Sequence, residues 1–196
     1  MTTTDPSAAA AKAAFRSEIR AARRARSESD RVDAAASIAA RALPLLTNCR
    51  SVACYLSMAT EPGTAALIDQ LRHLGIRVLL PRVSGTSLEW VEIQDSANFV
   101  TSELGIHEPV GPAIADALSN CDALVLPALA ISRDGIRLGQ GGGYYDRALQ
   151  RVPAFADGGP QLIALVFEDE LVDALPQESH DARVDQAVTP ERVVTF

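Results

Sequence analysis

The chain of 196 residues is predicted to form an α/β domain, a three-layer, open and mostly parallel sheet with helices on both faces and an N-terminal helical extension. Short apolar runs alternate with helix-favouring segments, and this alternation is typical of β-α-β units and so of a parallel sheet. Hydrophobic residues make up 47% of the chain and charged residues 22%, as in ordinary globular proteins. The length predicts one domain over residues 1–196, with 1–7 as a disordered tail.

Two helices are expected before the first strand. Residues 8–26 are mostly alanine and arginine, a composition that favours helix. Ser29 and Asp30 offer a cap for a second helix. That helix is expected to run to about Leu46, where Pro44 and the following Thr-Asn pair end it.

The remaining chain predicts the sheet and its crossover helices. The strands are short apolar runs bounded by turn residues, together with one alternating run that suits a strand with one wet face. They are expected at residues 51–57, 77–81, 87–93, 123–131 and 162–167, with an added edge in the tail 192–196. Helices are expected at residues 64–74 and 143–151.

The net charge of −7 argues against general nucleic-acid binding, because a phosphate backbone would be repelled. Residues 1–26 nevertheless carry six basic and two acidic side chains. Nucleic-acid binding through this segment is therefore a weaker alternative, and steep salt dependence would be its sign.

The three cysteines, Cys49, Cys54 and Cys121, show no CxxC spacing, so we expect buried reduced thiols and neither disulfides nor a zinc site. No run reaches the ~20 apolar residues that span a bilayer. The N-terminus has no basic region ahead of an apolar stretch, as a secretory signal would. These features predict a cytoplasmic protein without a membrane partner.

The stretch RLGQGGGYYDR, from Arg137 to Arg147, combines four glycines with two arginines and an aspartate. Glycines let a backbone aim N–H groups at a ligand, arginine forks match phosphate oxygens, and an aspartate can hold Mg²⁺. The stretch matches neither the dinucleotide fingerprint, which would need glycine at position 144, nor the Walker A motif. It predicts a phosphate cradle of another kind, with a structural turn as the alternative.

This stretch resembles the signature of the 5-formyltetrahydrofolate cyclo-ligase family, also called methenyltetrahydrofolate synthetases. Further motifs in the family's order extend the resemblance over almost the whole chain. They are Lys-x-x-x-Arg at Lys12 and Arg16, YLSMATEPGT with Glu61 and Thr64, LLPR at Leu79–Arg82, GIHEP at Gly105–Pro109, and HDARVD with His180, Asp181 and Asp185. Two positions depart from the family pattern: Gln140 stands where an aromatic or basic residue is common, and Pro62 where a β-branched residue is usual.

The resemblance implies an ATP- and Mg²⁺-dependent ligase of one-carbon metabolism. Its reaction would close 5-formyltetrahydrofolate to 5,10-methenyltetrahydrofolate with release of ADP and phosphate, through phosphorylation of the formyl oxygen and attack by N10. The implied partners are therefore ATP and the folate, with no nucleic acid and no membrane. A monomer is expected.

The resemblance also assigns roles to residues of this chain. Arg137 and Lys12 would be catalytic, and Asp146 and Asp185 would hold Mg²⁺. The folate would contact Leu56, Glu61 and Tyr144. ATP would be bound by Lys12, Arg16, Arg137, Leu138, Gly139, Gln140, Gly141, Gly142, Gly143, Tyr144 and Tyr145. His180 would order the segment from Asp181 to Asp185.

Each assignment has a plainer structural alternative. Lys12 and Arg16 alone would suit a solvated basic face, Asp146 the first turn of a helix, and Asp185 an ordinary surface position. Two other functions also fit the fold. One is a catalytically silent folate- or nucleotide-binding relative, and the other is a sugar-phosphate isomerase or acyl-CoA transferase on a similar sheet. Dependence on ATP separates the latter from the ligase.

Overall fold

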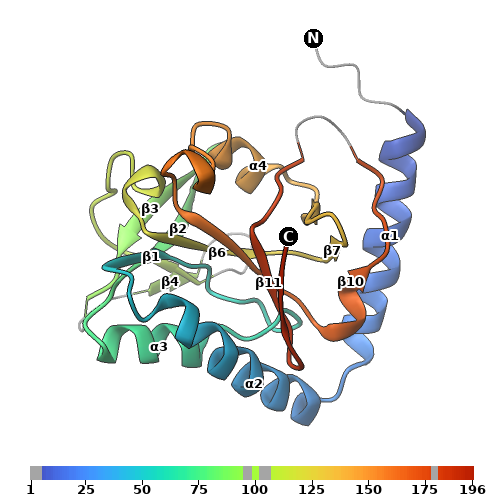
Figure 1. The fold of residues 1–196 in the computed structure, drawn as a ribbon, viewed down its shortest axis with the longest axis horizontal. Coiled ribbons are helices and arrows are strands. Elements are labelled where there is room, and N and C mark those ends of the chain that lie inside the picture. Colours follow the sequence, from blue (N-terminus) through green and yellow to red (C-terminus); the bar gives the residue numbers. More distant parts are fainter. Residues whose placement is uncertain (1–5, 95–98, 102–106, 178–180) are drawn as a thin grey trace.

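A seven-stranded sheet forms the centre of the computed structural model, which describes residues 6–94, 99–101, 107–177 and 181–196 (Figure 1). The strand order is β12-β11-β9-β6-β1-β2-β3, and all neighbours are parallel except the two edge pairs, β11–β12 and β2–β3. The strands are β1 (Ser51–Ala53), β2 (Arg77–Ser84), β3 (Ser87–Glu92), β6 (Ala123–Pro127), β9 (Gln161–Leu165), β11 (Gln186–Val188) and β12 (Val193–Thr195). The predicted open, mostly parallel sheet is confirmed.

Two small sheets flank the central one at the edge where the functional motifs cluster. The first has the order β10-β7-β8, and the second is the hairpin of β4 and β5. Their bounds are β7 (Ala130–Ser132), β8 (Arg137–Leu138), β10 (Leu171–Val172), β4 (Phe99–Thr101) and β5 (His107–Pro109). The sequence predicted neither small sheet.

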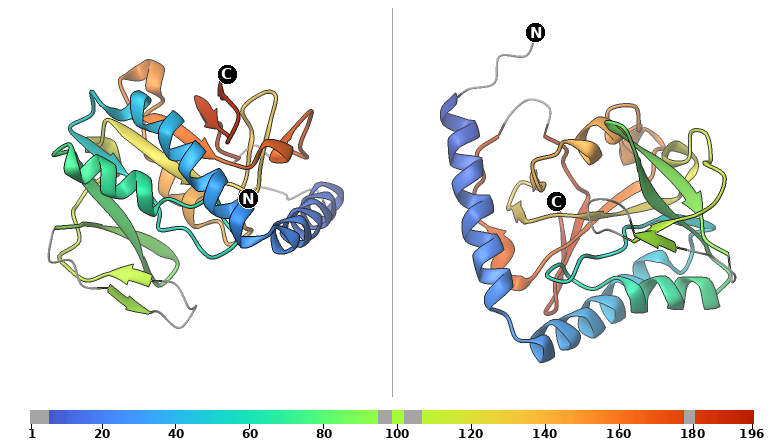
Figure 2. Two further views of the ribbon diagram at one scale, coloured as in Figure 1. Left: turned by 90° about the horizontal axis from the view of Figure 1, so that it is seen from below. Right: turned by 180° about the vertical axis from the view of Figure 1, so that it is seen from behind.

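The helices cover both faces of the central sheet, as predicted (Figure 2). Helices α2 and α3 pack on one face, while α4 and the 3₁₀ turn η1 pack on the other. The bounds are α1 (Pro6–Ala25), α2 (Glu28–Leu46), α3 (Ala65–His73), α4 (Tyr144–Leu149) and the turns η1 (Leu118–Asn120), η2 (Phe155–Asp157) and η3 (Glu168–Glu170). Among the described helices, none is long and apolar enough to cross a bilayer.

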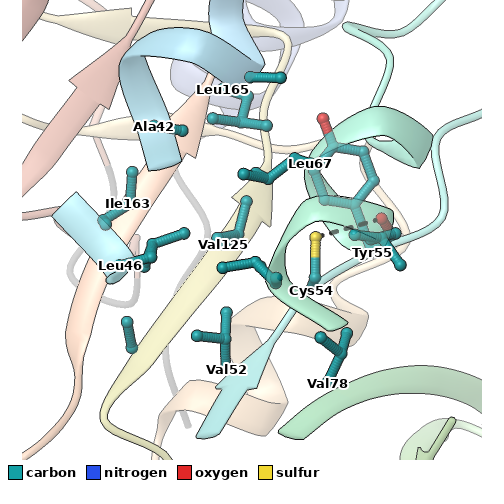
Figure 3. Packing of buried hydrophobic residues seen from close by; sticks show 14 of the residues in the cluster. Ala42, Leu46, Val52, Cys54, Tyr55, Leu67, Val78, Val125, Ile163 and Leu165 are labelled. Atoms are coloured by element: carbon teal, nitrogen blue, oxygen red, sulfur yellow. Dashed lines mark hydrogen bonds between the residues drawn. The ribbon is translucent and has the colours of Figure 1, made fainter. Parts of the chain in front are cut away.

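The larger apolar cluster lies between the sheet and the α2–α3 pair (Figure 3). Val52, Val125 and Ile163 come from adjacent parallel strands and meet Leu46 and Leu67 from the two helices. Strands buried on both faces need apolar residues throughout, which explains why the predicted strands lack alternation. Cys54 and Cys121 are buried as expected, whereas Cys49 is only half-buried.

Helix α1 lies apart from the α2–α3 layer, beside the β10-β7-β8 sheet (Figures 1 and 2). Phe15 and Ile19 on this helix pack against Leu129, Ala130 and Leu138. This contact places one face of a basic helix along the strand that leads into the glycine-rich stretch. The predicted N-terminal extension is therefore docked against the domain.

Several predicted boundaries were wrong for local reasons. Helix α1 begins at Pro6, so the predicted tail loses its last two residues, and residues 1–5 lie outside the described part of the chain. Ser27 caps α2, since its Oγ accepts from the Asp30 backbone N–H at 3.1 Å, and Pro44 lies inside that helix. The caps predicted at Ser29 and Asp30 belong to its first turn.

Two predicted strands are shorter than expected. The run 51–57 is a strand only to Ala53, because the Tyr55 carbonyl accepts from the Thr64 hydroxyl at 2.7 Å and the chain turns away. The run 123–131 contributes to two different sheets. Its break follows Pro127, which has no N–H for a ladder, and Leu129 N–H instead bonds the Leu138 carbonyl at 2.7 Å.

Candidate active site

The glycine-rich stretch forms a loop, residues 139–143, between β8 and α4. Gly141 and Gly143 have φ angles of 103° and 67°, in the left-handed region that favours glycine. Arg147 ties the loop to the β2–β3 turn, because it donates to the Thr86 carbonyl at 2.8 Å and to the Gly142 carbonyl at 3.1 Å. The loop is thus held in a defined shape.

Two basic side chains of α1 bond this loop. Arg16 Nε donates to the Gly139 carbonyl at 2.9 Å, and Arg20 Nη2 donates to the Gln140 carbonyl at 2.6 Å. Lys12 is buried, and its Nζ lies 2.6 Å from a carboxylate oxygen of Asp181. Residues four apart share one helix face, so the predicted pair of cations is extended by Arg20 to a row of three.

Arg137 is fixed at the carboxyl end of β6. Its side chain is 2% exposed; Nη1 donates to the Pro127 carbonyl at 2.9 Å, and Nη2 pairs with Asp146. Its Nε is buried and has no partner among the described residues. A buried guanidinium held in this way loses little conformational freedom on binding an anion, which suits a charge clamp.

A pocket of about 270 Å³ opens beside the loop. Its walls come from the segment after β1, from β2 and β3, from β5, and from the glycine loop with the start of α4. Leu56, Glu61, Tyr144 and Tyr145 all line it, so the structure brings the predicted folate residues together with the predicted ATP loop. The pocket lies at the carboxyl edge of the parallel strands, where α/β sheets generally bind ligands.

Glu61 is a buried carboxylate with two defined partners. Its Oε2 accepts from the Met58 backbone N–H at 3.0 Å, and its Oε1 accepts from Gln140 Nε2 at 3.1 Å. Tyr55 also lines the pocket, and burial raises the pKa of its hydroxyl, which donates to the Pro62 carbonyl at 3.2 Å. The Glu61 loop is therefore internally bonded, and the carboxylate is oriented before any ligand arrives.

The structure does not bring the two predicted metal ligands together. Asp146 faces Arg137, but Asp185 is bonded at the opposite end of β9: its Oδ2 accepts from the Leu162 backbone N–H at 2.7 Å. Leu162 is three residues before Leu165, which pairs with Pro127. At ~3.3 Å per residue this separates the two sites by about 10 Å along the strand.

Three charged residues at or beside the site were not assigned to it from the sequence. Arg20 continues the i, i+4 spacing of Lys12 and Arg16 and was available from that signal. Glu108, in the GIHEP motif, is buried in the pocket wall. Asp181, in the HDARVD motif, pairs with Lys12 beside the site. His180 and the first two residues of GIHEP lie outside the described part of the chain.

An open α/β domain whose pocket at the carboxyl edge of the sheet combines a glycine loop, a buried arginine and a buried carboxylate belongs to the class of α/β enzymes. The chain belongs to the 5-formyltetrahydrofolate cyclo-ligase family, whose model matches residues 8–190. The expectation that it is a ligase of folate one-carbon metabolism is confirmed.

Individual relatives agree with this assignment. A 5-formyltetrahydrofolate cyclo-ligase of Mycolicibacterium smegmatis is 39% identical over 150 residues, which cover 73% of this chain and 75% of the relative. That of Escherichia coli K12 is 34% identical over 154 residues, covering 76% and 83%. The structure of Aquifex aeolicus 5,10-methenyltetrahydrofolate synthetase superposes with a TM-score of 0.81 at 26% identity, covering 94% of this chain and 92% of that one.

Proposed function

We propose that the chain closes 5-formyltetrahydrofolate to 5,10-methenyltetrahydrofolate in a reaction driven by ATP and dependent on Mg²⁺. The observation that carries the proposal is a pocket lined by the glycine loop, the buried Arg137 and the carboxylate of Glu61, with basic side chains of α1 bonded to that loop. The basic groups suit a polyphosphate, and the carboxylate suits the ring N–H groups of a pterin. The names of the relatives supply the substrate.

The chemistry explains why ATP is needed. A formamide oxygen is a poor leaving group, so N10 cannot displace it directly. In the proposed sequence the formyl oxygen attacks the γ-phosphorus and ADP leaves. N10 then attacks the activated formyl carbon and loses its proton, and the carbon–oxygen bond breaks to release phosphate with the former formyl oxygen.

Phosphoryl transfer needs positioning and charge neutralisation more than covalent help from the protein. Lys12 and Arg16 would bind the phosphates from α1, and the loop from Leu138 to Tyr145 would bind them from the other side. Arg137 is suited to the transferred group, because its guanidinium is rigidly held and its Nε is a buried donor without a partner among the described residues. Preorganised donors of this kind stabilise developing charge without reorganising.

The acidic residues fit a magnesium ion bound together with ATP. Asp146 keeps part of its carboxylate accessible, since its side chain is 22% exposed while it pairs with Arg137. The described residues contain no cluster of three metal-ligating side chains, and Mg²⁺ at phosphate sites generally uses one or two carboxylates plus the phosphates. We assign Asp146 as its ligand, whereas Asp185 is bonded to the Leu162 N–H and Asp181 pairs with Lys12. Bound Mg²⁺ would neutralise charge on the phosphates.

One absorbance experiment tests the proposal. Purified protein is mixed with 5-formyltetrahydrofolate and Mg²⁺, and the near-ultraviolet band of the methenyl product is followed before and after ATP is added. The band should grow only after ATP. Asp146→Asn and Arg137→Ala should each lower kcat by about 100-fold, whereas Arg24→Gln on the exposed face of α1 should not.

The other outcomes discriminate among the alternatives. A flat trace with measurable binding of ATP and the folate would identify a silent relative. A flat trace without folate binding would refute the assigned substrate. Product formation without ATP would refute phosphoryl activation.

A further inference from the structure

Gln140 connects the basic helix α1 to the carboxylate of Glu61. Its Oε1 accepts from Arg20 Nε at 3.2 Å and from Arg20 Nη2 at 3.1 Å, and its backbone carbonyl accepts from the same Nη2 at 2.6 Å. On the opposite side its Nε2 donates to Glu61 Oε1 at 3.1 Å. A continuous chain of hydrogen bonds therefore runs from α1 through Gln140 to the carboxylate of Glu61.

Arg20 determines which end of the Gln140 amide faces Glu61. A guanidinium has only donors and a carboxylate has only acceptors, whereas an amide has one end of each kind. The amide oxygen must therefore face Arg20 and the NH₂ group must face Glu61. The reversed amide would place donors against donors and acceptors against acceptors. Without Arg20, only Glu61 would favour this orientation of the Gln140 amide.

Gln140 in turn limits how Glu61 can bind a ligand. A carboxylate has about four acceptor positions. The Met58 N–H occupies one on Oε2 and Gln140 occupies one on Oε1, so the plane of the carboxylate is held from both oxygens. The remaining lone pairs keep a fixed direction in the pocket that Glu61 lines. A carboxylate held by Met58 alone could rotate about that single bond.

We propose that Arg20 and Gln140 are positioning residues for the folate: Arg20 orients the Gln140 amide, and Gln140 orients Glu61. The inference rests on the proposed function, because it takes Glu61 as a folate ligand. Arg20 lies on α1, the helix that carries the proposed ATP ligands Lys12 and Arg16. The inference gives Arg20 an effect on binding of the other substrate, the folate. It also gives Gln140 a role distinct from contact with the nucleotide.

The test measures binding of 5-formyltetrahydrofolate by calorimetry in the absence of nucleotide. Gln140→Met keeps the side-chain volume without hydrogen bonds, and should weaken folate binding about tenfold. Gln140→Glu keeps the acceptor for Arg20 but places a carboxylate against Glu61, and should weaken it further. Arg20→Gln should also weaken it, although Arg20 does not line the pocket. Arg24→Gln, on the same helix, should bind the folate as the wild type does.

The double variant Arg20→Gln with Gln140→Met distinguishes this chain of contacts from general damage. If Arg20 acts through Gln140, the double variant should bind folate no more weakly than Gln140→Met alone. Midpoints of urea unfolding should stay close to that of the wild type. Additive losses, or an Arg20→Gln variant with unchanged folate affinity, would overturn the inference and leave the proposed function standing. A wild type that binds no folate would refute the proposed function itself.

Discussion

Replacing Arg23 by methionine should cost the protein about 3–5 kcal/mol of unfolding free energy. Arg23 is 1% exposed, donates to both carboxylate oxygens of Glu170 at 2.7 and 2.8 Å, and donates to the Ala128 carbonyl at 2.6 Å. Methionine retains much of the apolar stem but leaves Glu170 as a buried carboxylate without its cation. An uncompensated buried charge, more than the lost attraction, sets this magnitude.

Urea unfolding of three variants separates the cost of the unpaired Glu170 charge from the loss of its attraction to Arg23. Arg23→Met should show the full loss, whereas Arg23→Met combined with Glu170→Gln should recover most of it. Glutamine carries no charge and can still accept the Phe167 N–H that Glu170 Oε2 now accepts at 2.9 Å. Arg24→Met, at an exposed position next along the helix, should stay within about 0.5 kcal/mol of the wild type.

The same variant has a pH signature and a functional one. Burial raises the pKa of Glu170, so without Arg23 the folded state should bind a proton more readily than the unfolded state. The stability deficit should therefore shrink as the pH falls from neutral toward the ordinary carboxyl pKa of 4.5. Arg23 lies about two turns from Arg16, so looser docking of α1 should also raise the KM for ATP. A loss below about 1 kcal/mol, or an equal loss in Arg24→Met, would refute this reasoning.

Three further predictions concern the site and the core. Asp181→Asn should raise the KM for ATP, because Asp181 pairs with Lys12. Asp185→Asn should leave that KM unchanged and cost about 1 kcal/mol of stability, because Asp185 accepts from the Leu162 N–H. If Asp185→Asn raised the KM for ATP and Asp181→Asn did not, Asp185 would be restored as the ligand predicted from the sequence. Burial raises the pKa of Cys54 to about 12 from 9.0. Between pH 8 and 10 the wild type should therefore lose about 1.4 kcal/mol more unfolding free energy than Cys54→Ala. Parallel curves of unfolding free energy against pH would contradict this. Glu108 lines the pocket, so in steady-state kinetics Glu108→Gln should raise the KM for 5-formyltetrahydrofolate about tenfold without changing the KM for ATP. A change in the KM for ATP alone would contradict a place for Glu108 at the folate.

Much of the fold followed from local patterns. Apolar runs too short for helices and too uniform for exposed strands predicted a buried parallel sheet, because strands covered on both faces need apolar side chains throughout. The i, i+4 spacing of Lys12 and Arg16 predicted two cations on one helix face; in the structure Arg16 bonds the Gly139 carbonyl of the glycine loop and Lys12 pairs with Asp181. The glycines of that stretch predicted a loop, either a phosphate cradle or a structural turn, and in the structure Gly141 and Gly143 adopt left-handed φ angles that favour glycine.

Tertiary structure alone decided which motif residues meet. Asp181 and Asp185 belong to one short motif, but the pairing of β11 with β9 sends Asp185 to the far end of the sheet and leaves Asp181 beside Lys12. Arg23 and Glu170 are 147 positions apart, and no local pattern relates them. By itself the sequence determined the kinds of groups available and the local backbone. Their partners depended on strand register and helix docking, which arise from contacts between distant segments and not from the spacing of neighbours.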